Sequence, residues 1–164
     1  MKKHLLYTTL TILAAIITIC PVLAQSTGGP LPVITEIMYN PPEAGNDQHE
    51  FVEVYNPSLV SPINMGGFFF SSGFTFSFPS NFVLGPDEYV IVAGDSVLFE
   101  SVFGVEAFQW DGAVTQLNNN GEGIALRHTS IGLVDTVSYD DVAPWPTAAN
   151  GLGYSLVLCD PSSD

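Results

Sequence analysis

Apolar and polar residues alternate in short runs along most of this chain, and Gly, Pro and Asn stand between the runs. A period of two residues is typical of a β-strand with one face in a core and the other toward solvent. The pattern predicts strands over residues 33–39, 50–56, 67–71, 74–78, 88–94, 123–128, 133–139 and 154–158. Many short strands at close spacing indicate an all-β sandwich.

A helical period is nearly absent from the chain. The sequence DSVLFESVFG, residues 95–104, predicts one or two helical turns and interrupts the succession of strands.

The phenylalanine-rich runs distinguish inward from outward positions. In FTFSF, residues 74–78, the three Phe residues share one face and are predicted to lie in the core. In FFF, residues 68–70, the same alternation predicts that Phe68 and Phe70 point toward the core and that Phe69 points toward solvent. We therefore take Phe69 as a candidate contact residue for a partner, although single exposed apolar side chains are common on soluble domains.

The first 24 residues predict a secretory signal peptide. Lys2 and Lys3 precede an apolar run, and the small-residue site that ends at Ala24 predicts cleavage before Gln25. A membrane anchor and a lipoprotein signal at Cys20 are the alternatives, but the apolar run is shorter than the roughly 20 residues that span a bilayer. We expect a signal peptide over 1–24, a linker over 25–32, one domain over 33–164, and no membrane insertion after cleavage.

Charge narrows the range of partners. The whole chain has a formal charge of −14, and the segment after Ala24 contains one basic residue, Arg127, against 17 Asp and Glu. Phosphate contacts dominate nucleic-acid affinity and need several Lys or Arg, so DNA and RNA are excluded as partners. Solubility outside the cell is the simplest explanation of the acidity, and binding of divalent cations or cationic partners is the alternative.

Cys159 is the one cysteine that follows the signal peptide. An internal disulfide is therefore not expected, and we predict a buried thiol that packs as a small apolar side chain. Pairing with a cysteine beyond residue 164 is the alternative.

Two glutamates interrupt the apolar strand EFVEVYN, residues 50–56, and they fall on opposite faces of it. A buried carboxylate must be paired or hydrogen-bonded. Because the domain has almost no basic residues, Glu50 and Glu53 need backbone N–H groups, hydroxyls, water or a metal ion. At least one of them is expected to hold a neighbouring loop to the sheet.

Calcium is the candidate ligand for these acids. Ca²⁺ takes six to eight oxygen ligands, and Glu36, Asp47, Glu50 and Glu53 lie on or beside the loop that joins the first two predicted strands. The sequence lacks the DxDxDG pattern of a calcium loop, and ordinary solvated surface carboxylates are the alternative.

The order of motifs resembles the lamin tail domain family, in the form carried by exported bacterial proteins. The resemblance runs from about residue 33 to residue 160 and rests on ITEIMYNPP, EFVEVYNP, INMGGFFFSSG, FPSNFVLGPDEYVIVAG and GLVDTVSYDD in this order. It implies an immunoglobulin-like β-sandwich that is not itself an enzyme. The nuclear role of the eukaryotic members does not transfer, because the chain has an export signal and neither a heptad rod nor a basic cluster.

The sequence contains no recognisable catalytic motif, in agreement with a domain that is not an enzyme. The domain contains His49 and His128 outside any HExxH frame, and no GxSxG sequence. We expect a secreted, non-catalytic interaction or tethering module that binds a protein or a surface polysaccharide. The alternative is an accessory domain of a secreted phosphoesterase or nuclease whose catalytic part lies beyond residue 164, and the downstream coding sequence would decide between the two.

Overall fold

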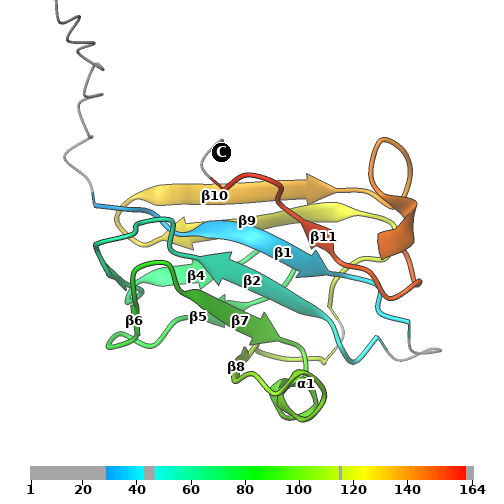
Figure 1. Cartoon of the computed structure of the whole chain (residues 1–164), viewed down its shortest axis with the longest axis horizontal. Coiled ribbons are helices and arrows are strands. Elements are labelled where there is room, and N and C mark those ends of the chain that lie inside the picture. Colours follow the sequence, from blue (N-terminus) through cyan, green and yellow to red (C-terminus); the bar gives the residue numbers. More distant parts are fainter. Residues whose placement is uncertain (1–28, 43–46, 115, 162–164) are drawn as a thin grey trace, which may run out of the picture.

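Two β-sheets pack face to face and form the body of the molecule (Figure 1). The structure is a computed structural model that describes residues 29–42, 47–114 and 116–161. The expected signal peptide, residues 1–24, lies outside the described residues.

The five-stranded sheet has the order β11-β1-β2-β7-β8. Its strands are β1 (Val33–Met38), β2 (Phe51–Tyr55), β7 (Tyr89–Ala93), β8 (Ala107–Gln109) and β11 (Leu156–Val157). Neighbouring strands are antiparallel except β7 and β8, which run parallel.

The four-stranded sheet has the order β10-β9-β4-β5, and all its pairs are antiparallel. Its strands are β10 (Gly132–Tyr139), β9 (Glu122–His128), β4 (Phe68–Phe70) and β5 (Phe76–Ser77). A separate short pair joins β3 (Ile63–Asn64) to β6 (Val83–Leu84), and a single 3-10 turn covers Thr147–Ala149.

The main core fills the space between the sheets. The inward faces of the strands supply aliphatic and aromatic side chains, which include Val52, Val54, Phe70, Ile124 and Leu126. The phenylalanine predictions are confirmed: the three Phe residues of FTFSF are buried, Phe68 and Phe70 are buried, and Phe69 is partly exposed.

The one α-helix among the described residues, α1 (Ser96–Phe103), covers part of the outer face of the five-stranded sheet. The side chain of Asp95 caps its start by accepting a hydrogen bond from the Leu98 N–H at 2.9 Å, and Gly104 ends it with a left-handed φ of 71°. A second apolar cluster forms beneath the helix and consists of Met38, Phe51, Ile91, Ala93 and Phe99. The strand β2 is therefore buried on both faces at this end.

The expectation of an all-β, immunoglobulin-like sandwich is confirmed. All eight predicted strands have a counterpart, and the helical turns over 95–104 are present. The strands β3, β6 and β8 were not predicted, because two or three residues are too few to show an alternating pattern. No helix in the described part of the chain is long and apolar enough to cross a bilayer.

Candidate functional site

Glu50 fastens a loop to the five-stranded sheet. It directly precedes β2, lies on the core side of the strand, and is only 1 % exposed. Its Oε2 accepts hydrogen bonds from the backbone N–H groups of Gln116 at 2.8 Å and Leu117 at 3.1 Å. One of the two functions expected of these glutamates, holding a loop in place, is thus seen at Glu50.

The surroundings of Glu50 favour its neutral form. Burial raises the pKa of the carboxyl to about 7, and the two backbone N–H groups oppose this shift only in part. The nearby carboxylates of Asp47 and Glu122 raise the pKa further. The other carboxyl oxygen, Oε1, is buried and has no hydrogen-bond partner among the described residues.

Asp47 lies beside this loop as well. Its Oδ2 accepts a hydrogen bond from Asn119 Nδ2 at 2.9 Å, and its backbone has a positive φ of 41°. Asp47 and Glu50 therefore share one end of the sandwich.

Glu36 and Glu53 form a different pair, on β1 and β2. They are direct partners in the register of the two strands. Thr35 Oγ1 donates to Glu53 Oε1 at 2.8 Å, and Ser155 Oγ donates to Glu36 Oε1. Burial raises the pKa of Glu53, the Thr35 hydrogen bond lowers it, and the charge of Glu36 raises it.

The four candidate calcium ligands thus fall into two pairs, one at the end of β2 and the other on the paired strands β1 and β2. Among the described residues, no group of three or more His, Cys, Asp and Glu side chains is placed to hold a metal ion. Calcium binding stays a prediction.

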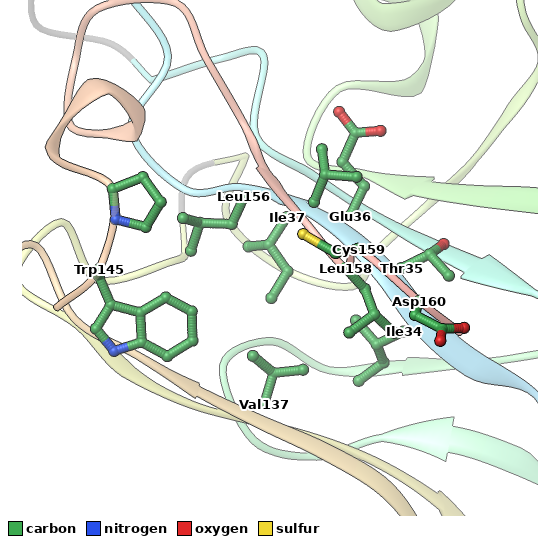
Figure 2. Close-up of a pocket in the computed structure, with 12 residues that line it drawn as sticks. Ile34, Thr35, Glu36, Ile37, Val137, Trp145, Leu156, Leu158, Cys159 and Asp160 are labelled. Atoms are coloured by element: carbon green, nitrogen blue, oxygen red, sulfur yellow. The ribbon is translucent and has the colours of Figure 1, made fainter. Parts of the chain in front are cut away.

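Sequence reasoning missed an apolar groove of about 370 Å³ at one edge of the sandwich (Figure 2). The groove lies between β1 and β11 on one side and β10 on the other, and the segment around Trp145 closes one end. Its apolar lining includes Ile34, Ile37, Val137, Trp145, Leu156 and Leu158. The one sequence signal was a tryptophan between two prolines, PWP at 144–146, which stands outside the alternating pattern.

A hydrogen bond connects the two sheets beside the groove. The backbone N–H of Ile34 on β1 donates to Asp135 Oδ2 on β10 at 2.7 Å. This hydrogen bond joins β1 of the five-stranded sheet to β10, an end strand of the four-stranded sheet, although no β-ladder connects the two sheets.

The prediction of a buried Cys159 is wrong. The thiol is free and exposed, and it lies in the wall of the groove. Cys159 lies beyond the two residues of β11 and directly after Leu158, whose N–H donates to the Thr35 carbonyl at 2.8 Å. Beyond that bond the chain leaves the sheet and no longer faces the core.

Phe69 lies on the outer face of the four-stranded sheet. Its neighbours in register are Ser77 on β5 and Arg127 on β9. Its partial exposure agrees with the sequence pattern, and its part in an interaction stays a prediction.

Both described histidines pack against aromatic rings. The ring of His128 lies 4.6 Å from that of Phe68, and His128 Nδ1 accepts a hydrogen bond from the Ser130 N–H at 3.2 Å. The ring of His49 meets that of Phe103 edge to face at 6.3 Å. The two imidazoles thus contact different elements of the fold.

Comparison with known families agrees with this architecture. The family model of the lamin tail domain matches residues 25–141, which extend from before β1 to just after β10. No curated protein matches the chain.

Proposed function

Because the chain belongs to the lamin tail domain family, whose members are non-catalytic immunoglobulin-like interaction domains, we propose that it is a secreted interaction or tethering module of a bacterial cell-surface or exported protein. The observation that carries this proposal is the family match, which includes both main sheets except for β11. The partner is a protein or a surface polysaccharide, and the module itself catalyses no reaction.

Two properties of the sequence support the proposed location. The apolar leader with Lys2 and Lys3 is typical of exported chains. The segment after Ala24 is acidic and contains no lysine, which suits solubility outside the cell and opposes binding to nucleic acid or anionic lipid.

A reporter fusion tests the tethering function. The full chain is fused through residue 164 to a small secreted enzyme. The fusion is produced in a bacterial host whose exported proteins can reach the cell surface. We expect the reporter to remain with the cells, and the protein to begin at Gln25 when its N-terminus is determined by mass spectrometry.

The matched control is the same reporter behind residues 1–24 alone, which is expected to enter the medium. If both fusions are released equally, the module does not tether. If the full fusion stays in the cytoplasm, the proposed export is wrong.

A further inference from the structure

Two buried side-chain oxygens at the start of β2 have no hydrogen-bond partner among the described residues. They are Oε1 of Glu50, a residue that is 1 % exposed, and Oδ1 of Asn119. The oxygens of an ionised carboxylate and of an amide can only accept hydrogen bonds. A buried acceptor without a donor is costly, and a bound water or ion can supply the missing partner.

A closed ring of hydrogen bonds holds these two oxygens in one small region. Glu50 Oε2 accepts from the Leu117 N–H at 3.1 Å, and two residues further along this loop Asn119 Nδ2 donates to Asp47 Oδ2 at 2.9 Å. The ring closes through the backbone, where the Glu50 N–H donates to the Asp47 carbonyl at 3.4 Å. Two carboxylates and one amide therefore lie together at the end of the sandwich where β2 begins.

The charges in this region favour a cation over a neutral water molecule. The carboxylates of Asp47 and Glu122 lie near enough to Glu50 to raise the pKa of its carboxyl. The one Arg or Lys in the described part of the chain, Arg127, has an exposed side chain near the far end of β9, about 16 Å from Glu122 along the strand. Arg127 is therefore too distant to neutralise these acids.

The available ligand atoms suit calcium. All of them are oxygens, and the two carboxylates match the double charge of Ca²⁺, which takes six to eight oxygen ligands and accepts water among them. Asp47 is partly exposed, which gives an ion a path from solvent. One of the three ligands is an amide, so the set is compatible with the absence, among the described residues, of any metal-binding group of three His, Cys, Asp or Glu.

We propose that Glu50, Asp47 and Asn119 bind one calcium ion, which fastens the loop between β8 and β9 to the start of β2. Glu50 and Asn119 coordinate the ion through the two oxygens that lack donors, and Asp47 coordinates it through its carboxylate. Of the four acids that the sequence predicts as calcium ligands, Asp47 and Glu50 belong to this site, whereas Glu36 and Glu53 do not. Asn119 is a ligand that the sequence pattern did not indicate.

A calcium titration of the purified exported chain tests the site. Metal is removed with EDTA and the chelator by dialysis, and calcium chloride is then added in a calorimeter at constant ionic strength. The titration is done at about pH 8, above the pKa of about 7 that burial gives Glu50 when no ion is bound. We expect one ion per chain, and magnesium chloride should bind about tenfold more weakly or worse, because Mg²⁺ demands octahedral geometry and loses its water reluctantly.

Variants that change one ligand at a time locate the ion. Glu50→Gln keeps an oxygen for the N–H groups of the loop and replaces the unpartnered oxygen by an amide N–H, so the fold should persist while calcium binding is lost. Asp47→Asn removes one charge without changing the shape of the side chain, and it should weaken binding by about tenfold or more. The matched control is Glu100→Gln, which removes an equal charge from an exposed position on α1 and should leave binding unchanged.

Near-ultraviolet circular dichroism checks that each variant is folded. If Glu50→Gln does not fold, Asn119→Ala provides the same test, since it removes the neutral ligand and should weaken binding severalfold.

Several results would overturn the proposal. They are the absence of calcium binding, equal affinity for Ca²⁺ and Mg²⁺, or unchanged calcium binding in folded Glu50→Gln; water alone would then satisfy the two oxygens. Loss of binding in Glu53→Gln with full binding in Glu50→Gln would place the ion at the pair that Glu53 forms with Glu36, and it would overturn the proposal as well.

Discussion

Single polar residues at both ends of β2 organise the loops around the core. Glu50 precedes the strand and Asn56 follows it, both on the core side, and they are 1 % and 0 % exposed. Glu50 holds the loop at residues 116–117, while Asn56 Nδ2 donates to the carbonyl oxygens of Ser61, Leu84 and Gly85. Because each of the two side chains hydrogen-bonds to backbone groups of other segments, these segments are held at the two ends of β2.

The buried Glu50 should make stability depend on pH. Its pKa of about 7 in the folded state is above the ordinary 4.5, so the unfolded chain releases this proton first as the pH rises. Its contribution to the free energy of unfolding therefore falls between about pH 4.5 and 7, by about 3 kcal/mol in total. Glu50→Gln cannot ionise and should lose this part of the slope.

Urea unfolding of both proteins between pH 4.5 and 8 provides the measurement. Between about pH 4.5 and 7, the free energy of unfolding of the wild type should fall by about 3 kcal/mol relative to that of Glu50→Gln. Above pH 7 the difference between the two proteins should stay constant. If the free energies of unfolding of the two proteins ran parallel across this pH range, Glu50 would have the same pKa in the folded and the unfolded chain.

Loss of the Asn56 side chain should destabilise the fold strongly. In Asn56→Ala three carbonyl oxygens lose their donor and the Ser58 N–H loses its acceptor, Asn56 Oδ1 at 3.0 Å. We expect a loss of roughly 3 kcal/mol in urea unfolding, since buried polar groups without partners are costly. The exposed Asn64, which accepts one bond from Gly66 N–H, is the matched control, and Asn64→Ala should cost about 1 kcal/mol or less.

At the scale of elements, α1 covers the outer face of β2, and this strand is therefore buried on both faces. Phe99 is the one fully buried residue of the helix, and its ring meets that of Phe51 at 5.1 Å. The sequence predicted the helical turns from DSVLFESVFG. It did not predict their position on the sheet, because that depends on the parallel pairing of β7 with β8, a strand of three residues.

Removal of the Phe99 ring should loosen this helix. Phe99→Ala leaves a cavity in the apolar cluster beneath α1, and we expect a loss of about 3–5 kcal/mol in urea unfolding. Val97 on the same helix is 77 % exposed, so Val97→Ala should change stability by less than about 0.5 kcal/mol. Similar losses in both variants would contradict the packing role of Phe99.

For the whole molecule, the strand pattern and the order of motifs were sufficient to predict the sandwich. The alternation in EFVEVYN put the two glutamates on opposite faces of the strand, and the scarcity of basic residues implied that each would need backbone N–H groups, hydroxyls, water or a metal ion. The groove could not be predicted, because its walls come from β1, β10 and β11, which are distant in sequence. Cys159 was misplaced for a related reason: its exposure depends on where the pairing of β11 with β1 ends.

The net charge of −14 sets how the molecule responds to cations. At constant ionic strength the screening of this charge is the same in millimolar Ca²⁺ and in millimolar Mg²⁺, so without a specific site both ions should shift the midpoint of thermal unfolding similarly, relative to EDTA. A shift with Ca²⁺ that exceeds the shift with Mg²⁺ would show a specific calcium site. In that case Glu36→Gln and Asp47→Asn would tell which of the two acidic pairs holds the ion.

The exposed thiol of Cys159 has a practical consequence. If the leader is removed with Cys20, residues 25–164 contain one cysteine, and that cysteine lies in the wall of the groove. A maleimide dye attached there would report occupation of the groove directly, without any engineered residue. The same label on living cells would tell whether the groove is already filled where the protein resides.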